Sequence, residues 1–169
     1  LDGLEAGVER DLETVQKVCT SGGARNVRVA RDDAERMKLW QGRKKAFGAM
    51  GSLSPHLVVQ DAVIPRTKLP ELLSHIRAIS EKYNVIVCNV LHAGDGNLHP
   101  NISYNADDPV EAERVHKAMR EIMGACVDAG GSITGEHGVG LDKLDYMQLI
   151  FSPSTLATMC DLRGVFDPD

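Results

Sequence analysis

A tight turn in the middle of the chain constrains the fold more than any other feature of the sequence. The stretch VIVCNVLHAGDGNLHPNIS enters this turn with an apolar run and leaves it with an alternating one. The dipeptide Asp95-Gly96 between two such runs is a strong signal for a β-hairpin with a two-residue turn. The sequence therefore predicts two antiparallel strands here, and a sheet that is at least partly antiparallel.

Helices and strands alternate on both sides of this hairpin. Apolar residues at helical spacing predict three helices, over residues 4–19, 69–83 and 109–129. Asp32 and Glu35 predict a capping box that begins another helix, which runs to about Met50, and Ser152 begins a last short helix. Strands are predicted in the stretches NVRVA and HLVVQDAVIP, and a strand-and-loop segment in GGSITGEHGVG. This order predicts an α+β fold of the ferredoxin-like plait kind, with a mainly antiparallel sheet and helices packed on it.

Composition excludes several classes of protein. The net charge of −5, with basic residues spread along the chain, gives no reason to expect a nucleic-acid partner. No apolar run approaches the ~20 residues of a transmembrane helix. The four cysteines form no CxxC pair and three of them lie in apolar stretches, which favours buried free thiols in a reducing compartment. We therefore expect a cytoplasmic protein without a transmembrane segment, either free or peripheral at a membrane within its parent protein.

The two ends of the sequence indicate a piece of a longer protein. The first residue is Leu1 rather than Met, and the last residues, GVFDPD, end on turn-forming chemistry. The length of 169 residues fits one domain with a sizeable core. Residues 1–169 are therefore expected to be a single domain taken from a longer chain.

The predicted hairpin places two histidines opposite each other. With Asp95-Gly96 at the turn centre, His92 pairs with His99, and Asn101 lies on the same face. Directly opposed residues have Cβ atoms about 5 Å apart, so both imidazoles can reach one metal ion. The alternative is two histidines that hydrogen-bond to backbone carbonyls in a half-buried sheet.

The stretch TGEHGVG offers a third ligand. Neighbours in an extended segment point to opposite sides, so Glu136 and His137 are not expected to bind the same ion. Glu136 would then be a ligand, and His137 an acid or base nearby. Two histidines, a glutamate and an open position are typical of a catalytic metal. The alternatives are a glycine-rich loop with a salt-bridged glutamate, or a phosphate cradle, although the pattern is not that of a P-loop.

An arginine interrupts an apolar stripe in the helix that begins near Asp32. Leu39, Arg43, Ala46 and Met50 fall on one side of this helix. Arg43 is either a snorkelling side chain or a guanidinium that binds a carboxylate through two parallel hydrogen bonds.

Four stretches together resemble a known family. In chain order they are WQGRKKAF, VIPRTKL, LHAGDGNLHPNI and GEHGVG. They are similar to the C-terminal half of the FAD-linked 2-hydroxyacid oxidoreductases, and most of all to the branch of the glycolate oxidase D subunit and D-lactate dehydrogenases. The resemblance covers the whole chain and implies a ferredoxin-like cap domain over a flavin. The domain that mainly binds FAD would lie N-terminal to this sequence, so the fragment alone is expected to be inactive.

The resemblance also assigns roles to residues. His92, His99 and Glu136 match the family's ligands of a divalent metal, Zn2+ or Mn2+. His137 matches the base that takes the proton of the substrate hydroxyl, while the α-hydrogen leaves as hydride to FAD and a 2-oxo acid results.

Further residues match the substrate contacts of the family. Arg43 matches an arginine that binds the substrate carboxylate, and Asn101 a substrate-contacting amide. Phe47 stands where members that take dicarboxylates have a hydroxyl, which favours a small monocarboxylate such as glycolate or D-lactate. The implied partners are this substrate, the protein's own FAD domain, and other oxidase subunits or an electron acceptor. Two other classes of function stay open, a non-catalytic metal-binding plait module and a metal-dependent hydrolase.

Overall fold

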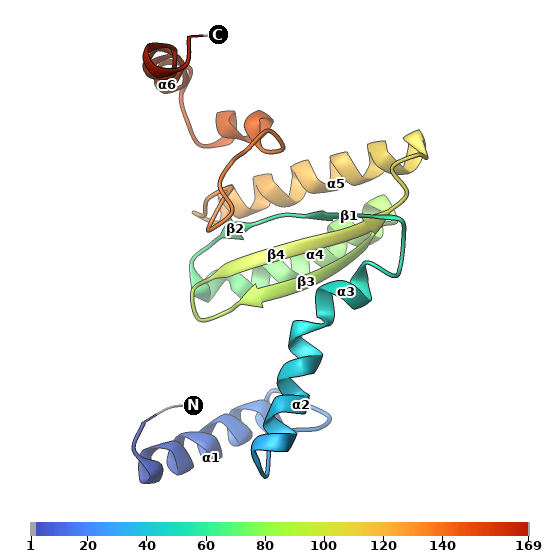
Figure 1. The fold of residues 1–169 in the computed structure, drawn as a ribbon, viewed down its shortest axis with the longest axis vertical. Helices are drawn as coiled ribbons and strands as arrows, with labels where there is room; N and C mark the ends of the chain where they lie inside the picture. The colour runs from blue at the N-terminus through green and yellow to red at the C-terminus, as the bar shows by residue number, and fades with distance from the viewer. Residues whose placement is uncertain (1–2, 169) are drawn as a thin grey trace. The chain divides into compact units, whose positions relative to one another are not determined.

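The computed structural model describes residues 3–168 (Figure 1). They form two compact units, which divide between residues 46 and 47. Among the described helices, none has the length and apolar character needed to cross a membrane. All four cysteines are free thiols, as the sequence predicted, but only Cys126 is buried, and its burial raises its pKa to about 12.

The first unit contains helices α1 (Glu5–Ser21) and α2 (Asp33–Lys44). Asp32 caps α2, because its Oδ1 accepts a hydrogen bond of 2.7 Å from the backbone N–H of Glu35. The Glu35 carboxylate accepts from the backbone N–H of Arg31 rather than from that of Asp32, so half of the predicted capping box forms. This bond, with those from the guanidinium groups of Arg28 and Arg31, lowers the pKa of Glu35 to about 2.

Two predicted elements of this region differ in the structure. The helix expected to reach Met50 ends at Lys44, and a separate short helix, α3 (Ala46–Met50), follows. Gly42 and Gly48 lower the helix propensity on both sides of this break. Among the described residues 3–46 no strand forms, so the strand predicted for NVRVA is wrong. A strand needs a partner for its backbone hydrogen bonds, and this unit supplies only helices.

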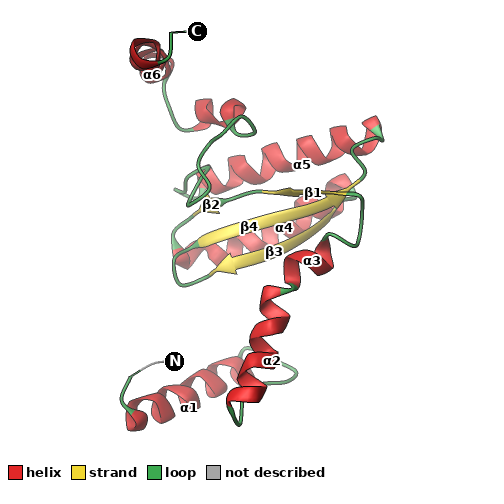
Figure 2. Cartoon of the chain, viewed as in Figure 1, coloured by secondary structure: helices red, strands yellow, loops and turns green. Residues whose placement is uncertain are grey.

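The second unit contains a sheet of four strands, β1 (His56–Val59), β2 (Ala62–Val63), β3 (Ile86–His92) and β4 (Asn97–Tyr104). β4 is central: it pairs with β3 along one edge and with β1 and β2 along the other, always antiparallel (Figure 2). Ser132 adds an antiparallel bridge to Val63 at the outer edge. This order is that of a ferredoxin-like plait, so the predicted fold class is confirmed.

Two long helices pack on one face of this sheet. They are α4 (Leu69–Tyr83) and α5 (Pro109–Asp128), which the sequence located to within a residue at each end. Their apolar sides and alternate residues of β4 form one buried cluster, which includes Leu72, Ile76, Ile79, Leu98, Ile102, Val115, Met119 and Ile122. The polar residues of β4 lie on the opposite face of the sheet, which these two helices do not cover. Two 3-10 helices, η1 (Arg66–Lys68) and η2 (Leu144–Leu149), and the helix α6 (Pro153–Phe166) complete the unit.

The hairpin forms, but its register differs from the prediction. His92 pairs with Asn97, and Val90 rather than His92 pairs with His99, so residues 93–96 form a four-residue loop. A two-residue turn of type I′ needs a positive φ at both central residues, and Gly96 has one (73°) whereas Asp95 does not. The carbonyl of Gly96, just outside the ladder, accepts a hydrogen bond of 3.0 Å from the N–H of Ile64, just after β2. The shift is two residues, so His92 and His99 still lie on the same face.

Truncation of the core at Ile122 tests this packing. Ile122 on α5 is fully buried, so Ile122→Ala should lower the free energy of unfolding by about 2–5 kcal/mol through lost burial and the cavity that remains. The measurement is urea denaturation followed by circular dichroism. Val110→Ala, at a 66% exposed position near the start of the same helix, is the control and should change stability little. Equal effects of the two substitutions would contradict the assigned core.

Candidate metal centre

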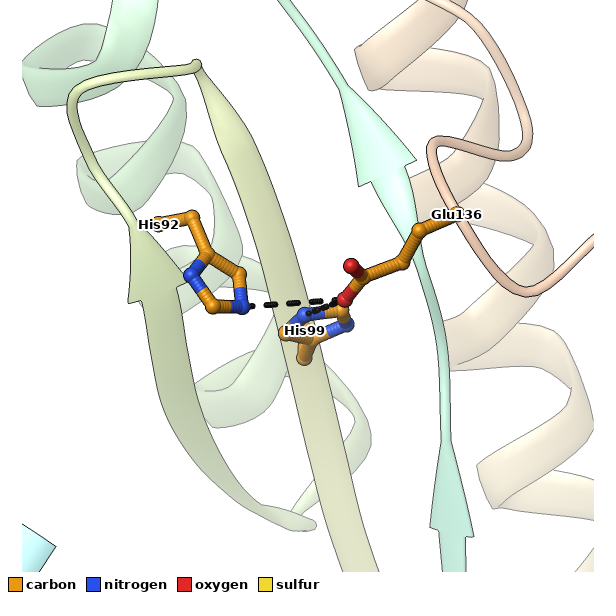
Figure 3. Close-up of side chains that lie close together, drawn as sticks. All are labelled: His92, His99 and Glu136. Atoms are coloured by element: carbon orange, nitrogen blue, oxygen red, sulfur yellow. Dashed lines mark ion pairs between the residues drawn. The ribbon is translucent and has the colours of Figure 1, made fainter.

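Three potential ligands converge on the sheet face that the helices leave uncovered. His92 lies at the end of β3, His99 on β4, and Glu136 on the loop that follows Ser132 (Figure 3). Oε1 of Glu136 lies 3.1 Å from Nε2 of His99 and 3.6 Å from Nε2 of His92. In the described part of the chain, these three residues form the one group of histidine, cysteine and acidic side chains whose ligand atoms all lie within 4.8 Å of one another.

The orientation of His99 is set by the backbone beside it. Its Nδ1 lies 3.2 Å from the carbonyl oxygen of Gln60, which can only accept, so Nδ1 carries the proton. In the neutral ring the other nitrogen, Nε2, then presents its lone pair toward Glu136. The His99 side chain is 4% exposed, whereas those of His92 and Glu136 are 46% and 52% exposed. The cluster is therefore anchored on one side and open to solvent on the other.

Asp61 organises the loop that carries Glu136. This residue lies between β1 and β2, in register with His99, and is fully buried. Its Oδ2 accepts hydrogen bonds from the hydroxyl of Thr134, at 2.9 Å, and from the backbone N–H groups of Gly135, Glu136 and His137, at 2.8, 2.9 and 2.9 Å. One carboxylate oxygen thus bonds to four consecutive loop residues.

The Asp61 carboxylate is held in its charged form. Burial by itself raises the pKa of Asp61, but the backbone hydrogen bonds from His137, Gly135 and Glu136, with that from the Thr134 hydroxyl, outweigh it and hold the pKa well below its usual range. Lys143 compensates the buried charge, with Nζ 3.6 Å from Oδ2 and 3.0 Å from the backbone oxygen of Asp61. Burial lowers the pKa of Lys143, an effect that the charge of Asp61 partly offsets.

Gly135 permits the close approach of loop and sheet. A Cβ atom at this position would lie 2.5 Å from Cγ2 of Val63 and 3.0 Å from Oδ1 of Asp61. Any larger residue would push the loop away from the strand. Gly135 therefore contacts the protein's own sheet.

His137 lies closer to the cluster than the extended-segment argument predicted. Residues 135–137 are not a strand but a loop curled around Asp61, so Glu136 and His137 do not point to opposite sides. The His137 ring stacks on that of His99, with centroids 5.0 Å apart and an angle of 14° between the planes. Its Nε2 lies 3.8 Å from Oε1 of Glu136, yet it is outside the group of mutually close ligand atoms.

Asn101 lies on the same face as the histidines but is 1% exposed. Its Nδ2 donates to the carbonyl oxygens of Cys88 and His99, at 3.1 and 2.6 Å. Its buried Oδ1 has no hydrogen-bond partner among the described residues. Asn101 therefore links β3 and β4, and its contact with a substrate stays a prediction.

Arg43 belongs to the first compact unit, on the last turn of α2, where it is exposed. Because α2 ends at Lys44, the predicted stripe from Leu39 to Met50 is not continuous on one helix. The carboxylate-binding role of Arg43 stays a prediction. The expectation at Phe47 depends on a side chain outside the described residues.

The sequence analysis missed Gln60, Asp61 and Lys143. A signal was present for Asp61, because an acidic residue inside the apolar stretch HLVVQDAVIP must find partners if that stretch is a buried strand. Gln60 acts through its backbone carbonyl, which its side chain does not reveal. Lys143 stands between Asp142 and Leu144 in a stretch that resembles ordinary surface sequence.

The sequence of the chain matches a known family and several known proteins. The family model of the C-terminal domain of FAD linked oxidases matches residues 1–169. The chain is 43% identical over 169 residues to the glycolate oxidase subunit GlcD of Escherichia coli (strain K12), which covers 100% of the chain and 34% of that protein. It is 36% identical over 167 residues to GlcD of Bacillus subtilis (strain 168), covering 99% of the chain and 36% of that protein.

A more distant relative is the mitochondrial D-lactate dehydrogenase [cytochrome] of Arabidopsis thaliana, 25% identical over 169 residues, with 99% of the chain and 30% of that protein covered. The chain thus spans about a third of the length of these curated relatives. The family model covers the whole chain, and both GlcD relatives belong to the group that the four quoted stretches resemble. The chain belongs to the family of FAD-linked oxidase C-terminal domains.

Proposed function

We propose that this chain is the C-terminal substrate domain of a longer, FAD-dependent 2-hydroxyacid oxidoreductase. The observation that carries the proposal is the convergence of His92, His99 and Glu136 on an open sheet face, within a chain of the FAD-linked oxidase family. Relatives named glycolate oxidase subunit and D-lactate dehydrogenase support a small 2-hydroxy acid as substrate. A cytoplasmic location and an N-terminal FAD domain are part of the proposal.

The donor set fits a divalent ion such as Zn2+ or Mn2+. Bonds of about 2.1 Å at tetrahedral angles put two ligand atoms about 3.4 Å apart. The separations of 3.1 and 3.6 Å between Glu136 and the two imidazoles bracket this value. Two histidines and a carboxylate with one exposed side also match the ligands of catalytic rather than structural sites.

The electrostatics of His99 and Glu136 support the same assignment. With the proton of His99 on Nδ1, its Nε2 lone pair and the Glu136 carboxylate face each other at 3.1 Å. Two acceptors at this distance repel unless a positive charge lies between them. A proton on Nε2 or a metal ion can supply that charge, and the nearby Nε2 of His92 favours the metal ion.

His137 is proposed to remove the proton of the substrate hydroxyl. Its ring is 47% exposed at the open side and stacks on that of His99. A divalent ion at the three ligands would lower the pKa of the hydroxyl, and FAD would accept the two electrons. His137 would then be the base that takes the proton of the substrate hydroxyl. Arg43 is proposed to bind the substrate carboxylate.

Ligand substitutions test the metal centre. His92→Ala, His99→Ala and Glu136→Ala should each reduce metal affinity by more than the ~10–100-fold loss typical of an outer-shell partner. His137→Ala should retain the metal but reduce kcat by about 100- to 10,000-fold, the contribution of a general base. The measurements are elemental analysis of the full-length protein and turnover of D-lactate and glycolate.

The control for these variants is His116→Ala, at an exposed position on α5, which should retain both metal and activity. Thermal unfolding of each variant checks that the domain stays folded. Metal loss in His137→Ala as complete as in His92→Ala would contradict the division of roles. Full metal content in all three ligand variants would exclude the site.

Substitution of Arg43 tests substrate binding. Arg43→Lys keeps the charge but removes the planar pair of donors, so KM for a 2-hydroxy acid should rise about 10- to 100-fold, since a hydrogen bond to a charged group contributes about 1.5–3 kcal/mol. Steady-state kinetics of the full-length enzyme measure the change. Arg36→Lys, on the same helix at an exposed pair with Asp33, is the control and should leave KM unchanged. An unchanged KM in Arg43→Lys would contradict a role in substrate binding and leave Arg43 as a snorkelling side chain on the helix surface.

A further inference from the structure

We propose that Asp61 is a positioning residue that sets the metal affinity of this centre, by holding the loop of Glu136 and His137 against His99. The inference rests on the proposed function of the three ligands. Asp61 is itself no ligand in this proposal, because its Oδ2 is occupied by the loop donors and its side chain is fully buried. It acts through the residues that it holds.

The argument begins with the exposure of the loop. Glu136 and His137 are about half exposed at their side chains, so side-chain packing does little to fix either of them. Their backbone N–H groups, however, both donate to Oδ2 of Asp61 at 2.9 Å. The position of these two residues relative to the sheet is therefore set largely by one buried carboxylate.

The second step is the connection to His99. Asp61 and Gln60 are neighbours in the short interruption between β1 and β2, and the carbonyl of Gln60 orients the His99 ring through Nδ1. The Oδ1 atom of Asp61 lies 3.9 Å from the same nitrogen. One dipeptide thus positions a histidine ligand on the strand and a glutamate ligand on the loop. The Gln60 carbonyl, as the hydrogen-bond partner of Nδ1, also raises the basicity of His99 Nε2, as outer-shell acceptors do.

The third step concerns charge. A carboxylate oxygen accepts four hydrogen bonds more strongly than a neutral amide oxygen would, because charge-assisted bonds are roughly twice as strong. The chain compensates this buried charge with Lys143, whose side chain is 6% exposed. Asp61 and Lys143 can therefore be neutralised together without leaving either charge buried alone.

The test compares three variants of the full-length protein. Asp61→Asn keeps the shape but removes the charge, Asp61→Asn with Lys143→Met removes both charges, and Thr134→Val removes one of the four donors. Metal-free protein is titrated with Zn2+ and with Mn2+ by calorimetry. We expect the dissociation constant to rise about 10- to 100-fold for both variants that contain Asp61→Asn, and less for Thr134→Val.

The control separates positioning from general stability. Ser80→Ala removes a part-buried hydrogen bond, from Ser80 Oγ to the Val85 carbonyl at the end of α4, and should lower the unfolding temperature without changing metal affinity. The absorption spectrum of Co2+-loaded protein gives a second readout, because it responds to ligand geometry. It should change in the Asp61 variants and not in Ser80→Ala.

Three results would overturn the inference, and they are distinguishable. Wild-type affinity in the folded double variant would exclude a positioning role for Asp61 while leaving the metal centre intact. Metal affinity that follows the unfolding temperature across all variants, Ser80→Ala included, would reduce Asp61 to a structural residue. A wild-type protein that binds neither ion would overturn the proposed metal centre together with this inference.

Discussion

The bonds at Oδ2 of Asp61 join the two parts of the molecule on which the candidate centre depends. The sheet supplies two histidines, and a loop more than thirty residues further along the chain supplies Glu136 and His137. Without a link between sheet and loop, nothing in the sheet would hold the half-exposed side chains of Glu136 and His137 beside His99. Four hydrogen bonds to one charged oxygen, with Lys143 as counter-charge, provide that link at a position inaccessible to water.

The central strand β4 serves the fold and the candidate centre at once. Alternate residues of a strand point to opposite faces, so Leu98 and Ile102 enter the core while His99 and Asn101 face the other way. The helices α4 and α5 cover only the first face. A mostly buried strand thus carries polar side chains on this face. The loop and the neighbouring strands, rather than helices, supply partners for the His99 ring and for Nδ2 of Asn101.

Much of the fold follows from local patterns. The helices α4 and α5 were located from their apolar spacing and the N-cap at Asp108, and the ferredoxin-like order followed from the alternation of helices with a hairpin. The expectations that were wrong concern segments whose structure needs a partner from elsewhere. NVRVA is a good strand sequence with no strand beside it in its unit. The helix predicted to reach Met50 ends at Lys44, two residues before the end of the first unit.

The candidate centre, like the fold, was in part predictable from the sequence and in part decided by tertiary contacts. The sequence by itself indicated the three candidate ligands, and it determined that His92 and His99 share a face, because side-chain direction in a strand has a period of two and survives a shift of two residues. Only the tertiary structure decided the register of the hairpin, whose loop bonds to the segment after β2 through Gly96 and Ile64. It also decided the side on which His137 lies, through the curl of its loop around Asp61. These contacts join residues distant in sequence, and a local pattern contains no information about which distant donor will reach a given acceptor.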